Sequence, residues 1–594
     1  MGKGQKAHRG DDGRDRHRRQ RTDTDERRRH RQADLAVPKP ARAPRRRPSM
    51  ASSVPHGRQQ DRRRSRHRGA HHQDAVQRGD YRVSDASRPE GQQASGGVPI
   101  SGGNVMNTKK LNRTTFKTSR EMDFFSEKEL VTQTGHEVSE WPLVIVKELI
   151  DNALDACEEH TITPVITVAA DASSITISDN GPGIPESTLA AALDFTIRAS
   201  SREGYVSPTR GAQGNALMTL FPMPRVVDPA GRMIVEANGK RHVITVRADP
   251  ISQRAVVHDD VSDIPKSKKT RLGVNKIKQA LSSGTSISME WSANEEEGII
   301  CWPFDGLTVH GKAYPGSFAQ RFRELCMGFA MFNPHLTLHL DWFGEKKTFT
   351  ATNPKWKKWL PSDPTSIHWY ECQHLERLLG AYITHDRDAG QDRLVSDFIR
   401  EFEGLTGSAK RTMVLDAADM KRMKLSELIV GDHLDSGRIE VLLGAMKRHT
   451  KPVASRRLGV IGEDHLRAFF VDGLGCVPDS FQYAKRTSEQ KVKKSDFGAD
   501  DKASFIPWCL ESAFGYLDDG GDEDEERRRI FAGANFSASI KNPFRSFGSS
   551  GEGLEAELNK LHVGGYEPIV FGLHLVHPRL EFTDRGKTAL IVGG

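Results

Sequence analysis

Apolar residues recur every three or four positions between residues 141 and 159, which is the spacing of one face of an α-helix. A proline at position 142 fits this reading, because the first turn of a helix tolerates proline. The pattern predicts an amphipathic helix from Trp141 to about Glu159. Its apolar stripe consists of Leu143, Val146, Ile150, Leu154 and Cys157.

Two short segments after this helix alternate between apolar and polar residues, as strands with one buried face do. They cover residues 164–170 and 174–179, and residues 171–173 between them have the composition of a turn. The second segment ends in Asp179-Asn180-Gly181, a strong turn signal. We therefore predict a helix followed by a β-hairpin with polar groups at its edge.

The remaining pattern predicts a mixed α/β protein. The expected elements are strands at 286–291 and 335–341, a helix at 316–330, mostly helical sequence over 393–447, and alternating strands and helices over 503–594. The acidic run from Asp518 to Glu526 is expected to be a solvated loop, because blocks of like charge repel one another.

Charge divides the chain into two unlike parts. Residues 1–100 hold 26 Lys and Arg against 12 Asp and Glu, with Tyr81 as their only aromatic residue, which leaves 61 against 67 in the rest. Such a segment cannot bury enough apolar surface to offset its ordering entropy, so we expect residues 1–105 to be disordered. This tail is interpreted as an extended leader, with Met106 as the true start, or as an arm that binds nucleic acid phosphates. We favour the leader.

The cysteines and the hydropathy exclude several classes of protein. The six cysteines lie far apart without a Cys-x-x-Cys pair, which argues against a disulfide framework and a zinc ribbon. No uncharged apolar stretch approaches the length of a membrane span, and the N-terminus has no apolar segment typical of a signal peptide. We expect a soluble, cytoplasmic protein that is associated with the nucleoid if it binds DNA.

Candidate chemistry lies on the polar side of the predicted helix. Glu148, Asn152 and Asp155 stand at i, i+4 and i+7, so they share one helical face. A strand end with Asp179 and two glycine-containing segments follow, 179–183 and 209–214. A carboxylate can accept a base amino group, an amide can hold a metal, and glycine amides can surround phosphates. These are the parts of a nucleotide site without a Walker lysine motif.

The order of these motifs resembles the superfamily of DNA gyrase, Hsp90, histidine kinases and MutL, abbreviated GHKL. Four sequence boxes match: Glu148-Leu-Ile-Asp-Asn152-Ala-Leu-Asp155-Ala156, Asp179-Asn-Gly-Pro-Gly183-Ile, Gly211-Ala-Gln-Gly214 and Gly284-Thr285. The resemblance implies the α/β sandwich ATPase domain of this superfamily, also called the Bergerat fold. It also implies ATP and Mg²⁺ as cofactors.

Within the superfamily, the sequence is most similar to the B subunit of type IIB topoisomerases, topoisomerase VI. Arg457-Leu-Gly-Val-Ile-Gly-Glu463 resembles the segment between that family's small helical domain and its transducer domain. Residues 566–571 and 582–587 resemble the transducer strand and its switch-lysine loop. The implied organisation is a tail over 1–105, an ATPase domain with an N-terminal strap over 106–385, a helical region and linker over 386–474, and an α/β transducer-like domain over 475–594.

The resemblance assigns a role to each matched residue. Glu148 would be the general base, and Asn152 would ligate Mg²⁺. Asp179 would accept a hydrogen bond from the adenine amino group with support from Thr285, and Lys587 would reach the γ-phosphate from the transducer. The remaining nucleotide contacts would come from Asp155, Gly181, Gly183, Gly211, Ala212, Gln213, Gly214 and Asn215.

Two departures from the family pattern affect these expectations. Ala216 stands where the phosphate loop usually has a third glycine, so the lid geometry is expected to differ and hydrolysis to be slow. Seven residues follow Lys587, whereas the family continues through a long helix and stalk. We therefore expect any contact with a cleavage subunit to be formed in a different way than in the family. No tyrosine nucleophile can be assigned, and strand cleavage by this chain alone is not expected.

The implied function is an ATPase that dimerises on ATP binding and closes around DNA, together with a separate cleavage subunit. Two alternatives stay open: an Hsp90-like clamp that closes on proteins, and a nucleotide-binding scaffold with little turnover. The strap over 116–141, with Phe124, Phe125 and Trp141, would cross to a second protomer in the family, or would pack on its own chain. His136 is interpreted as a structural or surface histidine and not as a ligand, and no transition-metal site is assigned.

Overall fold

The predicted helix and hairpin at the start of the folded region are confirmed. Helix α2 (Trp141–Glu159) carries the predicted apolar stripe, and all five of its members are buried. Strand β1 (Val165–Ala170) pairs antiparallel with β2 (Ser174–Asp179), and α2 packs on both strands. Periodicity alone therefore predicted the elements that carry most of the candidate site.

The computed structural model describes most of the chain from Phe124 onward. The described residues are 124–195, 204–210, 216–249, 254–264, 284–292, 295–296, 299–300, 307–308, 318–488, 506–518, 527–545, 553–583 and 586–591. The predicted tail over 1–105 and residues 519–526 of the acidic run lie outside this set. By their internal contacts, residues 110–594 form one unit.

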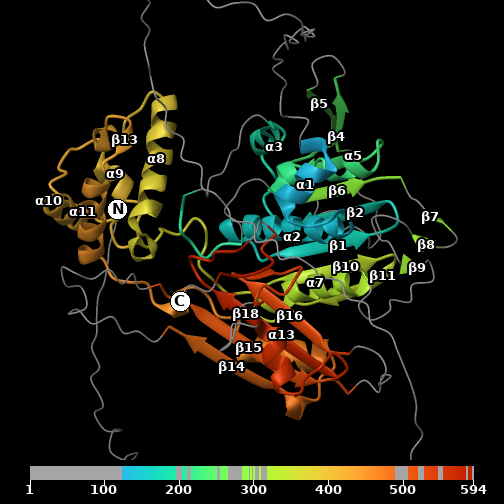
Figure 1. The fold of residues 1–594 in the computed structure, drawn as a ribbon. Coiled ribbons are helices and arrows are strands. Elements are labelled where there is room, and N and C mark those ends of the chain that lie inside the picture. The colour runs from blue at the N-terminus through green and yellow to red at the C-terminus, as the bar shows by residue number, and fades with distance from the viewer. Residues whose placement is uncertain are drawn as a thin grey trace, which may run out of the picture. The chain divides into compact units, whose positions relative to one another are not determined.

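The larger sheet has eight strands in the order β11-β10-β1-β2-β6-β3-β4-β5 (Figure 1). Strand β1 pairs with β10 in parallel, and the other neighbouring strands pair antiparallel. The bounds not yet given are β3 (Arg232–Ala237), β4 (Lys240–Ala248), β5 (Ala255–Asp263), β6 (Thr285–Glu290), β10 (Thr337–Trp342) and β11 (Glu345–Phe349). The strands predicted near 286–291 and 335–341 are therefore confirmed as β6 and β10.

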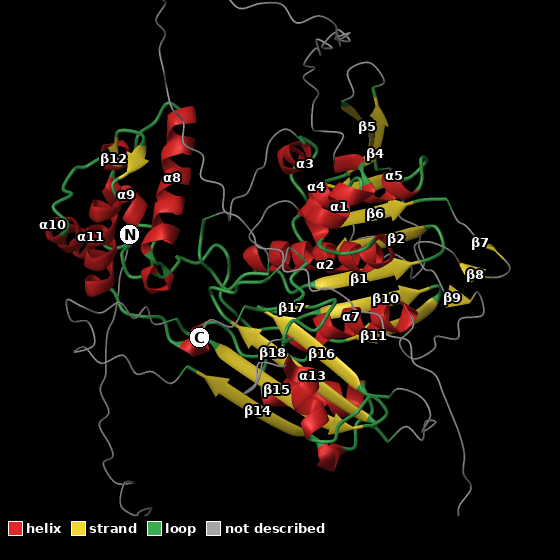
Figure 2. Ribbon diagram, in the orientation of Figure 1, coloured by secondary structure: helices red, strands yellow, loops and turns green. Residues whose placement is uncertain are grey.

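Several helices accompany this sheet (Figure 2). They are α1 (Glu127–Thr134), α3 (Glu186–Ala192), α4 (Ala216–Leu220), α5 (Met223–Val227) and α7 (Phe318–Phe332). A small separate sheet is formed by β7 (Glu295–Glu296), β8 (Ile299–Ile300) and β9 (Leu307–Thr308). The helix predicted at 316–330 is confirmed as α7. The α/β sandwich expected for the ATPase domain is present, with α2 and α7 packed on the sheet.

A second sheet of five strands lies in the C-terminal part, in the order β14-β15-β18-β16-β17. Its strands β16 and β18 are parallel, and helix α13 accompanies them. The bounds are β14 (Gln482–Thr487), β15 (Cys509–Tyr516), β16 (Arg529–Ala534), β17 (Ser537–Ala538), α13 (Gly553–Lys560) and β18 (Ile569–Val576). The alternation of strand and helix predicted for 503–594 is thus confirmed.

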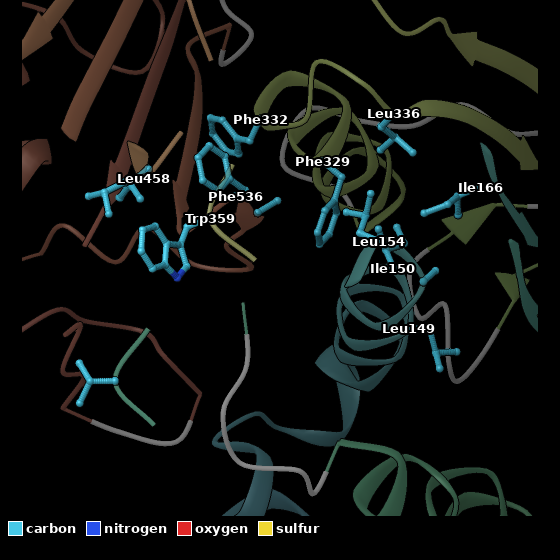
Figure 3. Packing of buried hydrophobic residues seen from close by; sticks show 14 of the residues in the cluster. Leu149, Ile150, Leu154, Ile166, Phe329, Phe332, Leu336, Trp359, Leu458 and Phe536 are labelled. Carbon is cyan, nitrogen blue, oxygen red and sulfur yellow. The ribbon is translucent and has the colours of Figure 1, made fainter. Parts of the chain in front are cut away.

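Helix α7 contacts both sheets. It packs on β10 of the larger sheet and on β16 and β17 of the smaller one, and it also touches α2. In Figure 3, Phe329 of α7 faces Leu154 of α2, while Phe332 lies toward Phe536. The contact with the smaller sheet is tight, because a Cβ atom on Gly533 would lie 2.5 Å from the Phe332 ring. The two sheets therefore share one hydrophobic core.

The helical region forms a small group of its own. Its members are α8 (Cys372–Asp388), α9 (Val395–Ile399), α10 (Ser408–Ala417) and α11 (Ser436–His449), with a short hairpin of β12 (Ile429–Val430) and β13 (His433–Leu434). Helix α11 packs against α8 and α10. The group therefore begins at α8, before residue 386, the predicted start of the helical region. Short helix α12 (Glu463–Ala468) then leads toward the second sheet. Within the described residues, none of the helices is both long enough and apolar enough for a membrane span.

Candidate functional site

Asp179 lies at the end of β2, with its carboxylate fixed by backbone amides. The Oδ1 atom accepts hydrogen bonds from the amides of Gly181, at 2.7 Å, and Thr285, at 3.3 Å. Burial raises the pKa of Asp179, while these two amides oppose the rise. The support from Thr285 thus comes from its backbone N–H. A partly buried carboxylate held in one direction is suited to accept a hydrogen bond from a ligand amino group.

The glycines around Asp179 leave space that no other residue would leave. A Cβ atom on Gly284 would lie 1.7 Å from the Asp179 carbonyl oxygen, and one on Gly181 would lie 2.8 Å from its carboxylate. Gly183 has φ +85°, a left-handed conformation that favours glycine. The close approach of the start of β6 to Asp179 therefore requires glycine at position 284, and Gly181, Gly183 and Gly284 together are called the glycine cradle.

Glu148 and Asn152 lie on the accessible side of α2. The Glu148 side chain is 25% exposed and accepts a hydrogen bond from Lys147 Nζ at 2.8 Å, whereas Asn152 is exposed. Burial alone would raise the pKa of Glu148, but the charges of Lys147 and Lys587 hold it below the usual glutamate range. Glu148 is therefore ionised at neutral pH and can orient a water molecule.

Asp155 does not share this accessible side. It is buried, and its Oδ1 atom accepts a hydrogen bond from Arg210 Nη1 at 2.7 Å. The face that the sequence predicts as common to Glu148, Asn152 and Asp155 therefore divides, because the C-terminal half of α2 is covered by Arg210 and by the second sheet. Asp155 stands in a structural ion pair in this arrangement.

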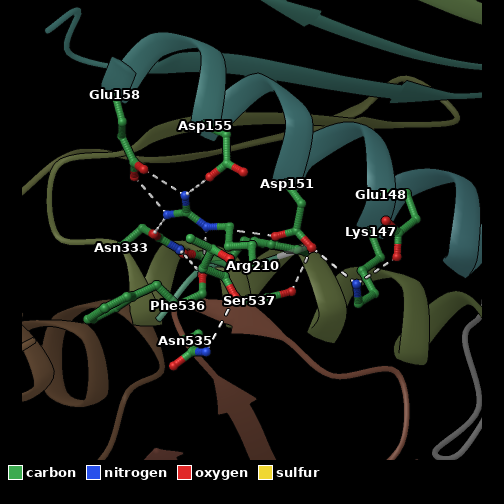
Figure 4. Close-up of polar contacts among 12 residues, drawn as sticks. Lys147, Glu148, Asp151, Asp155, Glu158, Arg210, Asn333, Asn535, Phe536 and Ser537 are labelled. Atoms are coloured by element: carbon green, nitrogen blue, oxygen red, sulfur yellow. Dashed lines mark hydrogen bonds and ion pairs between the residues drawn. The ribbon is translucent and has the colours of Figure 1, made fainter. Parts of the chain in front are cut away.

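Arg210 is the centre of a buried polar network (Figure 4). Its guanidinium donates to both Glu158 oxygens at 2.7 Å, to Asp155, and to Asn333 Oδ1 at 2.5 Å. Its Nε donates to the Phe536 carbonyl at 3.2 Å. The Arg210 side chain has no exposed surface. A buried charge is tolerated only with such complete pairing.

The network includes further charges from distant parts of the chain. Lys358 Nζ lies 3.0 Å from Glu158, and Lys147 Nζ lies 3.1 Å from Asp151, which also accepts a hydrogen bond from Ser537 at 2.7 Å. Burial lowers the pKa of Lys358 and raises the pKa of Asp151, although nearby opposite charges act against both shifts. Charged and polar residues of α2 thus form a buried network with both sheets, which we call the buried seam. Its members are Lys147, Asp151, Asp155, Glu158, Arg210, Asn333, Lys358 and Ser537.

Lys587 comes to the same place from the end of the chain. Its Nζ donates to the Arg210 carbonyl oxygen at 3.1 Å, and its φ of +55° is uncommon for a residue other than glycine. The preceding residue, Gly586, is held through its carbonyl by His136 Nε2 at 3.3 Å. Burial lowers the pKa of Lys587, and the positive charge of Lys147 lowers it further. The structure therefore brings Lys587 to Arg210, the residue that precedes the predicted phosphate loop.

Comparison with known proteins identifies the segment that contains most of this site. Residues 138–250 match the family of histidine kinase-, DNA gyrase B-, and HSP90-like ATPases. This segment is similar to the ATPase domains of that family. The matched residues include α2, the β1–β2 hairpin, Arg210 and strands β3 and β4. The superfamily resemblance stated from the sequence is confirmed.

Curated proteins similar to part of this chain include subunits of DNA topoisomerases and a mismatch repair protein. The B subunit of the type 2 DNA topoisomerase 6 from Archaeoglobus fulgidus is 41% identical over 76 residues, 12% of each chain. The DNA mismatch repair protein MutL of Acidiphilium cryptum is 32% identical over 145 residues, 22% of this chain and 24% of that protein. The chain thus matches less than a quarter of the length of these two relatives.

A solved structure of the DNA gyrase B subunit from Myxococcus xanthus is also similar. It aligns over 80% of this chain and 88% of its own, with 9% identity and a TM-score of 0.31. The N-terminal domain of a DNA repair protein aligns over 75% of this chain and 87% of its own, with 11% identity and a TM-score of 0.30. The assignment of the ATPase domain therefore rests on the sequence matches.

Part of the predicted site of the ATPase domain lies outside the described residues. This part is the predicted phosphate loop, Gly211, Ala212, Gln213, Gly214 and Asn215. Both flanks are described: Arg210 precedes the loop, and Ala216 begins α4. Arg210 is held in place by its hydrogen bonds, so the residue that precedes the predicted loop has a fixed position.

The described end of the strap packs on its own chain. The Phe124 and Phe125 rings lie 5.7 and 4.9 Å from the Phe195 ring. Trp141 is fully buried and donates to the His136 carbonyl at 3.2 Å. His136 is itself buried, and its Nδ1 atom lies 3.1 Å from Glu140. Its interpretation as a structural histidine is therefore confirmed.

Several members of the buried seam received no role from the sequence: Lys147, Asp151, Glu158, Asn333 and Lys358. One signal was available, because charged residues at 147, 151, 155 and 158 follow helical spacing on a helix whose other positions are mainly apolar. A charged stripe on an otherwise apolar helix indicates paired charges as well as it indicates a wet surface. Their partner Arg210 lies in the segment 209–214, to which the sequence analysis gave a role only through its glycines.

Proposed function

We propose that this protein binds ATP together with Mg²⁺ and hydrolyses it, and that the nucleotide controls dimerisation around DNA. The observation that carries the proposal is the hydrogen bond from Lys587 Nζ, in the C-terminal part of the chain, to the Arg210 carbonyl oxygen inside the segment that matches an ATPase domain. A cation that enters the matched segment from a separate part of the fold gives that part a direct way to sense a phosphate.

The adenine base would lie at the glycine cradle, and the residues there fit it. Asp179 offers a carboxylate fixed by the Gly181 amide to the adenine amino group. The Thr285 amide holds that carboxylate in place. A ligand without a donor in this position would lack this hydrogen bond to Asp179, so the site would favour a base that carries an amino group.

Glu148 and Asn152 would serve the phosphate end. Glu148 is ionised and accessible, so it would orient the attacking water as general base. Asn152 is exposed one helical turn further on, and its amide oxygen is a suitable ligand for Mg²⁺. Bound Mg²⁺ would neutralise phosphate charge. Lys587 would contact the γ-phosphate as a compact point charge, and residues 211–215 would cap the phosphates through backbone amides.

For the whole protein we propose a role like that of the B subunit of topoisomerase VI. ATP binding would bring two protomers together around DNA, and hydrolysis would reopen them, as a population shift driven by the γ-phosphate contact. A separate subunit would cut the DNA. The similarity to B subunits of type 2 DNA topoisomerase 6 supports this reading. The match covers 12% of the Archaeoglobus fulgidus subunit, so the proposal for DNA and partners rests on a likeness over a short segment.

The test compares the full chain with Glu148→Ala. The parent should hydrolyse ATP only with Mg²⁺, and a non-hydrolysable ATP analogue should increase its mass in light scattering. Glu148→Ala should retain nucleotide affinity but lose turnover by about 10²–10⁴-fold, the usual contribution of a general base. Stimulation by DNA, and not by unfolded protein, would favour the DNA clamp over a chaperone-like clamp. Parental turnover in Glu148→Ala would refute the assignment of the base.

A further inference from the structure

The side chain of Asn180, the residue directly after Asp179, continues the pairing of β1 where β2 ends. The last register pair of the hairpin joins Ile166 to Asp179. One position further on, the Asn180 amide oxygen accepts a hydrogen bond from the Val165 N–H at 2.8 Å, and its Nδ2 donates to the Thr163 carbonyl at 3.0 Å. A side chain thus replaces the main chain of β2 as the partner of the start of β1.

This replacement allows the backbone after Asp179 to leave the sheet. The chain turns at once, and the Gly181 N–H donates back to Asp179 Oδ1 at 2.7 Å. Such a contact, in which an aspartate side chain accepts from the backbone two residues further on, is an Asx turn. The direction of the Asp179 carboxylate therefore depends on the place where Asn180 fixes the start of the turn.

Helix α2 contacts the same asparagine. Cys157 of α2 is fully buried, and its Sγ lies 3.6 Å from the Asn180 amide oxygen. A Cβ atom on Gly181 would lie 3.3 Å from this sulfur, so the turn packs closely on the helix. Burial raises the pKa of the Cys157 thiol to about 12, so the thiol stays protonated and donates weakly to that oxygen.

The other end of the turn is held by a second asparagine, Asn238. It lies with Gly239 between β3 and β4, and the two residues have φ of +52° and +78°, as in the tight Asn-Gly turns of hairpins. Asn238 Nδ2 donates to the Ile184 carbonyl at 2.8 Å. A Cβ atom on Gly183 would lie 2.6 Å from the Asn238 amide oxygen. Asparagine side chains therefore hold the turn from Asp179 to Ile184 at both of its ends.

We propose that Asn180 and Asn238 are positioning residues that direct the Asp179 carboxylate toward the amino group of the nucleotide base. This inference rests on the proposed function, in which Asp179 accepts that group, and deepens it. Neither asparagine has a role in the chemistry proposed above. The inference gives both a share in the selection of the base.

Asparagine is specific at position 180 because both ends of its amide are used. The oxygen faces an N–H donor, and the nitrogen faces a carbonyl acceptor. Aspartate would lack the donor, and leucine would leave both backbone groups without this partner. At position 238 the left-handed φ favours asparagine or glycine, so Asn238→Gly removes the hydrogen bond without straining the hairpin.

The experiment measures base selectivity by calorimetry on the full chain in the presence of Mg²⁺. The two probes are ADP and purine riboside diphosphate, which differs from ADP only in lacking the amino group of the base. Neither probe carries a γ-phosphate, so binding is measured without turnover. The parent should bind ADP more tightly by about tenfold or more, since a hydrogen bond to a charged acceptor has this value.

Asn180→Ala should bind ADP about five- to tenfold more weakly than the parent, while its affinity for the probe without the amino group stays within about twofold. The preference for ADP is thereby lost. Asn238→Gly should reduce the preference less, because Asn180 still fixes the start of the turn. A residue that only stabilises the fold would leave the ratio of the two affinities unchanged.

Asn542→Ala is the matched control. Asn542 is also half-buried, and its amide oxygen accepts a hydrogen bond from a backbone N–H, that of Phe544 at 3.0 Å, but it lies in the C-terminal part of the chain. This control should keep the parental affinities for both probes.

The ratio of the two affinities decides the proposal. If Asn180→Ala folds and keeps the parental ratio, its role is structural and the inference is wrong. A parental ratio in Asn238→Gly overturns the role of Asn238, and it overturns the whole inference if Asn180→Ala does not fold. If the parent binds neither probe, or binds both equally, the proposed adenine site fails and the inference with it. A parent that prefers ADP, with variants that keep this preference, overturns the inference alone.

Discussion

Glu158→Gln tests whether the buried seam holds the two sheets together. The side chain of Glu158 is 5% exposed, and its two oxygens accept two hydrogen bonds from Arg210 at 2.7 Å, one from His335 at 3.0 Å, and an ion pair from Lys358 at 3.0 Å. Glutamine keeps the shape and removes the charge. Two buried cations then lose their shared carboxylate.

The expected loss in the free energy of unfolding is about 3–5 kcal/mol, the cost of leaving a buried charge without its partner. A protein of ordinary stability unfolds with about 5–15 kcal/mol, so this is a large fraction of the total. Glu158→Gln combined with Lys358→Met should lose less than the sum of the single changes, by about 0.5–3 kcal/mol, because the second change removes one unpaired cation.

The pH dependence has a definite sign. Burial on its own would raise the pKa of Glu158, but Arg210 and Lys358 hold it well below its ordinary value of 4.5. A carboxylate with a lowered pKa stabilises the fold above its unfolded pKa and loses that contribution as the pH falls through the folded value. The parent should therefore lose stability below pH 4.5, and Glu158→Gln should lose less over the same range.

Urea unfolding followed by tryptophan fluorescence measures these differences, since Trp359 is buried and adjoins Lys358 in the chain. Glu555→Gln is the control, because Glu555 also pairs with an arginine, Arg528 at 2.5 Å, but is 52% exposed. It should cost less than about 1 kcal/mol, as exposed pairs do. If Glu158→Gln costs no more than this control, the seam does not hold the sheets together and the reasoning is refuted.

Asp179→Asn should weaken ATP binding by about tenfold or more, because a hydrogen bond to a charged acceptor contributes about 1.5–3 kcal/mol; unchanged affinity in calorimetry would contradict the adenine assignment. Lys587→Ala should bind ATP with modest loss but fail to dimerise with a non-hydrolysable analogue, since it removes a coupling of about 1–3 kcal/mol. Parental light scattering and turnover in that variant would make Lys587 an ordinary lysine. A shortened chain starting at Met106 should bind ATP normally, given the composition of the tail; unfolding or lost binding would argue against a dispensable leader.

The sequence predicted those features that depend on local spacing. Helix α2, the β1–β2 hairpin and Asp179 at a strand end all follow from periodicity and turn signals over a few residues. The family motifs then pointed to Lys587, and the structure places that lysine against Arg210. Local reasoning succeeds here because one buried face fixes each element.

The contacts of the buried seam could not be predicted from local sequence patterns. Asp155 looks like an exposed polar residue until Arg210, 55 positions later, is folded against it. Arg210 in turn bonds to Phe536, 326 positions further on, through a backbone carbonyl that no side-chain pattern reveals. Pairing over such distances is decided by tertiary packing. A charged helix face therefore has two readings until its partners are known.

Helix α7 packs on both sheets, and this limits which substitutions the protein can accept during evolution. Phe332 fills the space beside Gly533, and Gly328 allows Ala538 to approach, since a Cβ atom there would lie 3.1 Å from that of Ala538. A larger residue on either side must be matched by a smaller one on the other. Recombination that exchanges the C-terminal sheet between relatives would thus succeed only if α7 travels with it, although α7 and that sheet lie far apart in the gene.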